Sequence, residues 1–345
     1  MHTSRLGKKL VVITSGDPAG IGPEIILKSL AGFSSSKKIR QPFGASHAFT
    51  PLVIGDYKVF QRIAKISKID ISSILPRRPG NFGIKEGLIN FIDLRNVPRG
   101  KIFFGKTNKI YGKAAMEYVS CGALIARSFK GASLVTAPIN KASIAKAGFS
   151  FAGHTEFLSH VTKSKKVTMM LVGGPLRVSL VSRHVAIKNV AKSITKTEIV
   201  KTLQNTSYAL KKFFKISCPK IGIAGLNPHA GESGVLGQEE RTVISPAVTY
   251  VKKKIKNSKF IGPLPADTLF YKAYRGDLDA VCCMYHDQGL IPLKMVAFEK
   301  GVNLTIGLPF IRTSPDHGTG FDIAGRDKAN PSSMIEAIKL AVELC

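Results

Sequence analysis

Three histidines, each following an apolar run, have the residue type and spacing of a metal site. The runs are residues 178–182, 220–226 and 280–285, and the histidines are His184, His229 and His286. Short apolar runs are typical of buried strands, and the carboxyl ends of parallel strands lie at one edge of a sheet. The three imidazoles can therefore converge on a catalytic Zn²⁺, Co²⁺ or Mn²⁺ ion that keeps open coordination positions. Three unrelated structural histidines are the alternative.

Two acidic residues could support such a site. Asp287 is next to His286, and Asp267 follows a proline-rich loop, 262–265. Either carboxylate could orient an imidazole or add an oxygen ligand to the metal.

A second group of candidates consists of cations and hydrogen-bond donors suited to an anion. His154 and Thr155 stand at the expected start of a helix, where the helix dipole favours negative charge. Arginine and lysine side chains bind phosphate and carboxylate groups. The group comprises His154, Thr155, Lys294, Asn303 and Arg312. Together these residues would clamp a phosphate or carboxylate, whereas each alone is an ordinary surface residue or helix cap.

Strand-like and helix-like segments alternate along the chain, which indicates parallel βαβ units and an α/β fold. Besides the three runs above, strands are expected at residues 9–13, 51–55 and 133–138. One helix is expected to begin near Pro23, and another after Thr195, which forms a capping box with Glu198. Segments 31–50 and 68–88, rich in charge and helix breakers, are expected to be loops.

The turn between the first strand and the first helix is rich in glycine and carries Asp17. Its spacing matches neither the GxGxxG nor the GxxxxGK[ST] pattern, so it is not interpreted as a nucleotide loop. A turn near a site and a purely structural turn are both open.

Composition limits the function classes. The 345 residues carry a formal net charge of +29, which suits nucleic acid, an anionic substrate or a lysine-rich solvated surface. The lysines are scattered and not interleaved with aromatic residues, and no nucleic-acid-binding motif accompanies them, which favours the solvated surface. The five cysteines form no CxxC pair, and no apolar run is long enough for a bilayer. The expectation is a reduced, cytoplasmic protein that binds neither membrane nor nucleic acid.

Several long motifs together resemble the 4-hydroxythreonine-4-phosphate dehydrogenase family of pyridoxal-phosphate biosynthesis. They are GDPAGIGPE (16–24), GHTE (153–156), GLNPHAGE (225–232), GPLPADTLF (262–270), YHDQG (285–289) and GVNLTIGLPFIRTSPDHGTG (301–320). The motifs are ordered over nearly the whole chain. Only segments 31–50 and 68–88 do not match the family.

The resemblance implies a fold and a set of site residues. The fold is that of the isocitrate and isopropylmalate dehydrogenases, with two α/β/α lobes and a cleft between them: residues 1–140 with 302–345, and residues 141–301. His184, His229 and His286 would bind one divalent metal (Zn, Co or Mg) per subunit, His286 reaching in from the partner subunit of a homodimer with its active site at the subunit interface. The second group above would bind the phosphorylated substrate.

The cofactor implied is NAD, with NADP also possible. His317, Asp322 and Asn330 lie in a segment similar to the adenosine-binding segment of the related β-decarboxylating dehydrogenases. Asp322 would accept hydrogen bonds from the ribose and disfavour a 2′-phosphate. Thr319–Phe321 departs from the small-residue pattern of those relatives.

The activity implied is NAD-dependent oxidation of 4-phosphooxy-L-threonine to 2-amino-3-oxo-4-phosphooxybutanoate, which then loses CO₂ to give 3-amino-1-hydroxyacetone phosphate. Lys294 and Asp267 are the candidates for the catalytic base, and the sequence does not separate them. A sister dehydrogenase acting on 4-phosphoerythronate or 4-phosphothreonate is one alternative. A basic nucleic-acid-binding protein on a dehydrogenase fold is the other.

Overall fold

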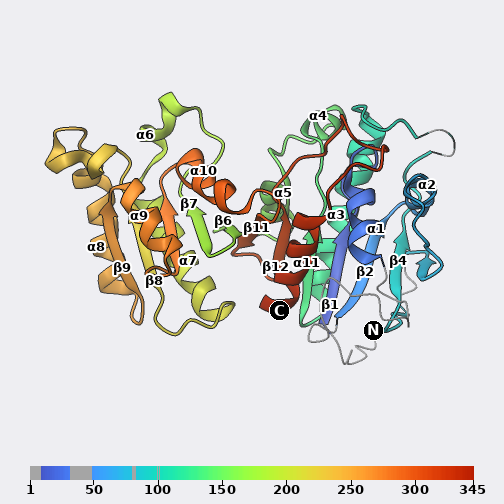
Figure 1. Ribbon diagram of the computed structural model, residues 1–345, viewed down its shortest axis with the longest axis horizontal. Helices are drawn as coiled ribbons and strands as arrows, with labels where there is room; N and C mark the ends of the chain where they lie inside the picture. Colours follow the sequence, from blue (N-terminus) through green and yellow to red (C-terminus); the bar gives the residue numbers. More distant parts are fainter. Residues whose placement is uncertain (1–8, 32–48, 80–82, 99, 101) are drawn as a thin grey trace. The chain divides into compact units, whose positions relative to one another are not determined.

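The computed structural model describes residues 9–31, 49–79, 83–98, 100 and 102–345 (Figure 1). Internal contacts divide the chain into two compact units. Unit 1 contains residues 1–165 and 308–345, and unit 2 contains residues 166–307. Both combine β-strands with helices, which confirms the predicted α/β class.

The strands of unit 1 are all parallel. Their order is β3-β4-β2-β1-β5-β12. They are β1 (Lys9–Thr14), β2 (Phe49–Gly55), β3 (Ile74–Arg77), β4 (Ile89–Asp93), β5 (Ala132–Thr136) and β12 (Ile311–Pro315). The helices are α1 (Gly22–Leu30), α2 (Tyr57–Ser67), α3 (Lys109–Ser128), α4 (Lys141–Lys146), α5 (His154–Val161) and α11 (Ser332–Leu344).

Strand β1 is buried on both faces, which explains its continuous apolar sequence. Leu10 and Val12 belong to the hydrophobic cluster formed with α3. Val11 and Ile13 point to the opposite face because side chains alternate along a strand, and both are fully buried. Helix α11 also packs on β1, β5 and β12. A run without polar positions is therefore required here.

Unit 2 has the strand order β11-β6-β7-β10-β8-β9. Its strands are β6 (Thr168–Gly173), β7 (Leu176–Leu180), β8 (Lys220–Ala224), β9 (Lys259–Leu264), β10 (Ala280–Cys283) and β11 (Val302–Ile306). The helices are α6 (Val190–Ser193), α7 (Lys196–Lys212), α8 (Ser245–Lys254), α9 (Ala266–Tyr274) and α10 (His286–Ala297). Strands β7, β10, β8 and β9 are parallel, whereas β6 runs antiparallel to both β7 and β11. The prediction of purely parallel units is therefore wrong for β6, because Gly174 and Pro175 form a tight connection to β7 with no crossover helix.

The central strand β10 also faces two hydrophobic layers. Cys282 packs in the cluster that includes residues of α7 and α8. Val281 and Cys283 pack in the cluster that includes residues of α9 and α10. The adjacent cysteines are fully buried free thiols whose pKa values burial raises, as expected of reduced structural cysteines.

Two sequence-based expectations are revised by the structure. Segment 68–88 contains the strand β3, which pairs with β4 in spite of its proline, because an edge strand tolerates one. Part of segment 31–50 lies outside the described residues. Residues 141–165, assigned from sequence to the second lobe, contact α3 through α4 and α5 and belong to unit 1. The chain returns to unit 1 between residues 307 and 308, whereas the boundary expected from the sequence lies between residues 301 and 302.

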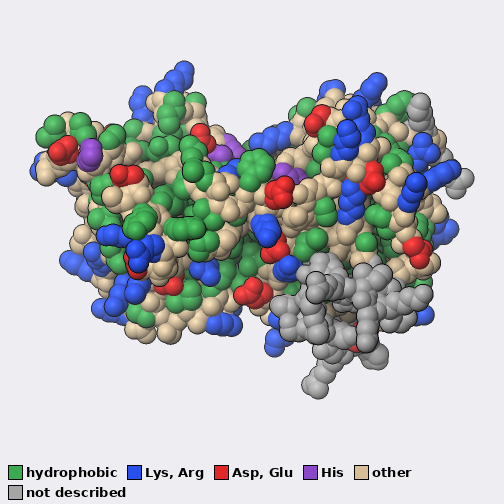
Figure 2. Space-filling model, in the orientation of Figure 1, with side chains coloured by type: hydrophobic (Ala, Val, Ile, Leu, Met, Phe, Trp, Pro, Cys, Tyr) green, Lys and Arg blue, Asp and Glu red, His purple; other side chains and the backbone are tan. Residues whose placement is uncertain are grey.

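Surface charge is spread widely within each unit. Lysine and arginine side chains are scattered over the face shown in Figure 2, with acidic and hydrophobic side chains between them. In the described part of the chain, no helix combines the length and apolarity needed to cross a membrane.

The turn after β1 is closely packed and holds a buried acid. Gly16 has φ +69°, and a Cβ there would lie 2.2 Å from the carbonyl oxygen of Pro138. Asp17 is fully buried and accepts a hydrogen bond from the backbone N–H of Ala19 at 2.9 Å. Burial raises the pKa of Asp17 to about 6, and outweighs the hydrogen bonds from Ala19 and Ser143 that lower it.

Substituting Asp17→Asn should change how stability depends on pH. The folded chain holds the Asp17 proton more tightly than the unfolded chain, so the stability of the wild-type protein falls as pH rises from 3.8 through about 6. The loss attributable to Asp17 is at most about 3 kcal/mol. In Asp17→Asn this part of the pH dependence is absent.

Urea denaturation at pH 4.5 and 7.5 measures the effect. Asp70→Asn is the control, because Asp70 lies on the surface and its carboxylate accepts hydrogen bonds from Ser72. An unchanged pH dependence in Asp17→Asn would contradict the prediction.

Candidate active site

A buried arginine lies at the centre of the candidate site in unit 1. Arg312 is on β12, opposite Leu134 of β5, and its side chain is 2 % exposed. Its Nη2 donates to the Thr136 hydroxyl at 2.5 Å. Burial lowers the pKa of Arg312 to about 9, and the nearby negative charge of Glu156 opposes this. A buried cation with a perturbed pKa is a candidate binding group for an anion.

Helix α5 brings His154 and Thr155 to the same cluster. His154 is the first residue of α5 and Thr155, the second, is buried, which confirms the predicted helix start. Burial and the charge of Arg312 lower the pKa of His154 well below 6.5. The Nε2 atom of His154 is buried and has no hydrogen-bond partner among the described residues. The cluster thus combines a neutral imidazole, a hydroxyl and a guanidinium.

In unit 2 the structure brings together two of the three candidate metal ligands. Strands β7 and β10 are neighbours, and their pairing continues past the strand ends, where Ser182 N donates to Met284 O at 3.1 Å. His184 and His286 follow this pairing, and their ring centroids are 5.6 Å apart. The separation is one that two imidazoles on a single tetrahedral ion can adopt. The Nδ1 of His286 lies 2.6 Å from Oδ1 of Asp287, which confirms that Asp287 can orient an imidazole.

Gln288 holds the strand ends beneath this pair, a role the sequence did not indicate. Its Oε1 accepts from Met284 N and its Nε2 donates to Gly225 O, both at 2.7 Å. The next residue, Gly289, allows α10 to approach β7, since a Cβ there would lie 2.5 Å from Cγ1 of Val178.

His229 lies apart from the other two histidines. Strand β8 ends at Ala224, and His229 follows in a turn in which five consecutive residues, 229–233, have left-handed φ values. The His229 side chain makes no hydrogen bond, ion pair or ring contact with the described residues. No group of three His, Cys, Asp or Glu residues arranged for a metal occurs in the described ranges. This chain alone therefore supplies a histidine pair and a separate third histidine.

A buried glutamate, Glu240, fixes the start of the His229 turn. Its Oε1 accepts from the backbone N–H groups of Leu226 and Asn227 at 2.7 and 2.8 Å. From the sequence, this segment was interpreted only as a glycine-rich turn with three acids. The role of Glu240 could not be predicted, because the hydrogen bond joins residues 14 apart in the sequence and leaves no local pattern.

The remaining candidates of unit 2 lie on separate elements. Asp267 is exposed in the first turn of α9 and has no polar partner among the described residues. Lys294 is on α10, with its Nζ 5.3 Å from the ring centroid of Phe298. Asn303 is on β11, and its buried Oδ1 has no hydrogen-bond partner in the described chain. These positions do not show which of Lys294 and Asp267 is the catalytic base.

The candidate cofactor residues lie in segment 316–331, between β12 and α11. His317 has a buried Nε2 atom with no partner among the described residues, and Asp322 is exposed. The Asn330 side chain instead accepts from Ser332 N at 2.9 Å, at the start of α11. The segment packs against the glycine-rich turn, since Ile21 N donates to Thr319 O at 2.9 Å. The glycine-rich turn, for which a structural role and a place near a site were both open, is thus adjacent to the candidate cofactor segment.

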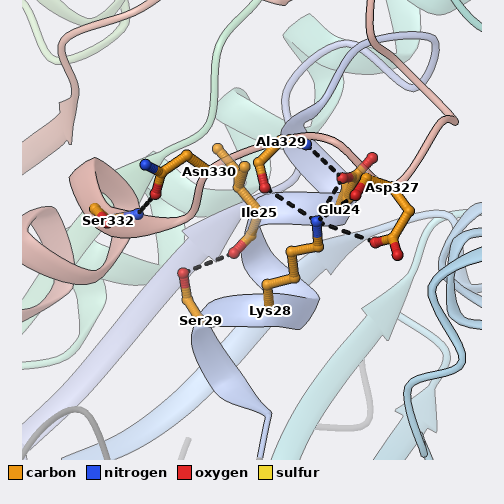
Figure 3. Close-up of polar contacts among 8 residues, drawn as sticks. All are labelled: Glu24, Ile25, Lys28, Ser29, Asp327, Ala329, Asn330 and Ser332. Atoms are coloured by element: carbon orange, nitrogen blue, oxygen red, sulfur yellow. Dashed lines mark hydrogen bonds and ion pairs between the residues drawn. The ribbon is translucent and has the colours of Figure 1, made fainter. Parts of the chain in front are cut away.

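Two charged residues of α1 hold the end of this segment (Figure 3). Lys28 Nζ contacts Oε1 of Glu24 at 2.8 Å and Oδ1 of Asp327 at 3.0 Å, and donates to Ala329 O at 3.0 Å. Glu24, which is fully buried, also accepts from Ala329 N at 2.8 Å.

Comparisons with known proteins agree with the sequence resemblance. The family model described as "Pyridoxal phosphate biosynthetic protein PdxA" matches residues 47–341. A 4-hydroxythreonine-4-phosphate dehydrogenase of Desulforapulum autotrophicum is 41% identical over 97% of this chain and 95% of its own. A D-threonate 4-phosphate dehydrogenase of Cupriavidus necator is 40% identical, with 97% of each chain covered.

A solved structure shows the same similarity in three dimensions. The crystal structure of 4-hydroxythreonine-4-phosphate dehydrogenase from Klebsiella pneumoniae is 35% identical with a TM-score of 0.84, and the match covers 98% of this chain and 99% of the other. The match is not confined to one unit. On these grounds the chain belongs to the PdxA family of pyridoxal phosphate biosynthetic proteins.

Proposed function

We propose that the protein is a dehydrogenase that oxidises 4-phosphooxy-L-threonine with NAD⁺ in pyridoxal 5′-phosphate biosynthesis. The observation that carries the proposal is the buried cluster of Arg312, His154 and Thr155, because a guanidinium, an imidazole and a hydroxyl are groups suited to bind a phosphate dianion. The names of the two relatives described above, each of which includes a small phosphorylated hydroxy acid, agree with such a ligand.

His184, His229 and His286 are the proposed metal ligands. The 5.6 Å separation of the His184 and His286 ring centroids fits two ligands of one ion. His229 would bind an ion together with ligands from a second copy of the chain, because the described residues of one chain form no group of three ligands. When bound, a divalent ion supplies Lewis-acid chemistry for a hydroxyl and a carbonyl, and the nicotinamide supplies the hydride acceptor.

The protein's own side chains bind the substrate and accept its proton. Arg312, His154 and Thr155 bind the phosphate, together with Lys294 and Asn303. The proton of the substrate hydroxyl passes to Asp267 or Lys294. The carbon that bears this hydroxyl loses hydride to NAD⁺ and becomes a ketone carbon. Loss of CO₂ from the resulting 3-oxo acid then gives 3-amino-1-hydroxyacetone phosphate.

A homodimer is the proposed active form. Ile291 and Met295 on α10 and Phe298, which directly follows it, are spaced at i, i+4 and i+7 and are 59%, 83% and 74% exposed. Such an apolar stripe on one helix face is typical of a protein interface. Because α10 begins at His286, a second copy on this face would lie close to the proposed metal ligands, and could complete the ligand set.

The second candidate function is oxidation of a phosphorylated sugar acid. Curated relatives of nearly equal identity, 40% and 41%, carry the two different substrate names. Both substrates have the phosphate and the hydroxyl that is oxidised. They differ at one other position, which carries an amino group in the first substrate and a hydroxyl in the second, so the protein can distinguish them only there.

Rates of NAD⁺ reduction with 4-phosphooxy-L-threonine, 4-phospho-D-threonate and 4-phosphoerythronate decide between the two functions. The amino substrate should have a kcat/KM at least about fivefold higher, because unmatched polar groups in a site cost roughly 1–3 kcal/mol. Chelation should abolish turnover and added Zn²⁺, Co²⁺ or Mg²⁺ should restore it.

His229→Ala should lose both metal content and turnover. Full activity of His229→Ala, or a higher rate with a sugar acid, would contradict the first proposal.

Substituting Arg312→Met should abolish stabilisation by inorganic phosphate. A ligand at 100 times its Kd stabilises a folded protein by about 2.7 kcal/mol, so saturating phosphate should raise the wild-type Tm by several degrees. Arg312→Met should show no such shift. Arg95→Met is the matched control, because Arg95 is an exposed arginine of the same unit that pairs with Asp93. An equal phosphate shift in Arg312→Met would place the anion elsewhere.

Substituting Met295→Asp should weaken the homodimer at least about tenfold, because a carboxylate in an apolar interface is left desolvated and unpaired. Sedimentation velocity over a dilution series should show a shift to monomer, with NAD⁺ reduction falling in parallel. Tyr250→Asp, which alters an exposed aromatic residue on α8, should leave the dimer intact. A Met295→Asp dimer of wild-type affinity would exclude this face.

A further inference from the structure

The segment that carries the proposed cofactor residues is irregular but anchored at two places to the first helical region. Near its start, Thr319 O accepts from Ile21 N, just before α1. Near its end, Ala329 N donates a hydrogen bond to Glu24 of α1, and Ala329 O accepts one from Lys28 of α1. Segment 316–331 therefore takes its position from α1, more than 290 residues away in sequence.

The second anchor, which we call the α1 latch, consists of Glu24, Lys28, Asp327 and Ala329 (Figure 3). Glu24 is fully buried, whereas the side chains of Lys28 and Asp327 are 20% and 44% exposed. A buried carboxylate is costly unless it is paired and hydrogen-bonded, and Lys28 with Ala329 N meets this need at Oε1 of Glu24. Asp327 has φ +60°, so the backbone at the latch occupies a conformation that its surroundings must hold.

The latch lies next to residues that would contact a dinucleotide. Asn330 directly follows Ala329 and is fixed by its bond to Ser332 N. Asp322 has no polar partner among the described residues, so its position depends on how the segment is held at both ends.

We propose that Glu24 and Lys28 are positioning residues for the dinucleotide: they hold segment 316–331 in the conformation that presents His317, Asp322 and Asn330. The inference rests on the proposed function, since it takes NAD⁺ as the ligand of this segment. A preorganised segment binds more tightly because less ordering cost is paid on binding. Loosening the latch should thus weaken NAD⁺ binding and leave the chemical step unchanged.

The test uses full-length protein and three variants. Asp327→Asn removes the exposed charge of the latch with little risk to folding, because asparagine tolerates left-handed φ. The double variant Glu24→Gln/Lys28→Met removes both charges together, which avoids leaving a buried carboxylate unpaired. Lys339→Met is the matched control, because Lys339 forms a comparable ion pair with Glu336 on α11.

Three quantities are measured for each variant: the Kd for NAD⁺ by calorimetry without substrate, hydrogen exchange of amides 316–331, and kcat with KM for NAD⁺. The double variant should bind NAD⁺ roughly tenfold more weakly. Its Ala329 amide should exchange faster, and kcat should stay within about twofold. Asp327→Asn should show a smaller change in the same direction, and the control none. The Tm shift produced by inorganic phosphate should not change.

The outcomes separate this inference from the proposed function. If the double variant binds NAD⁺ like the wild type while its Ala329 amide exchanges faster, the latch is only structural and the inference is wrong. A fall in kcat with unchanged NAD⁺ affinity would also overturn it. If the wild-type protein itself binds no NAD⁺, the proposed function fails, and the inference fails with it.

Discussion

Pairing between parallel strands positions both candidate clusters, and the carboxyl ends of such strands lie at one edge of a sheet. In unit 1, β12 lies parallel to β5 and places Arg312 beside Thr136, 176 residues earlier in the chain. In unit 2, β7 and β10 are parallel neighbours, so His184 and His286 follow the same edge. Side chains distant in sequence are thereby positioned by backbone hydrogen bonds, without long loops whose ordering would cost entropy.

Burial of charge distinguishes a structural group from a candidate binding group. Asp56 directly follows β2 and is 1% exposed, and it accepts from Asn96 N, Val97 N and the Tyr118 hydroxyl, so its charge is satisfied inside the protein. At the Arg312 cluster, burial lowers the pKa of both Arg312 and His154. Clustered pKa shifts of this kind are typical of functional sites.

Much of the fold could be predicted from sequence wherever one local pattern decided the structure. The apolar runs of β1 and β10, the helix start at His154 and the Thr195 cap, whose hydroxyl accepts from Glu198 N, have such patterns. Strand β3 did not, because Ile74–Arg77 lies in a polar, proline-containing segment and gains its strand conformation from pairing with β4. The antiparallel β6 was missed for the same reason: strand direction is a tertiary property that periodicity does not contain.

The candidate site was predictable in part because residue types show chemistry but not distance. The charge of Arg312 acts on His154, which is next to Thr155, and the His184 ring lies beside that of His286. The third histidine depends on the turn at 229–233, where consecutive left-handed residues cost conformational energy. Such strain persists only when the surroundings fix it, and buried Glu240, bonded to Leu226 N and Asn227 N, does so. Glu240 therefore fixes the start of the turn that places His229 away from the histidine pair.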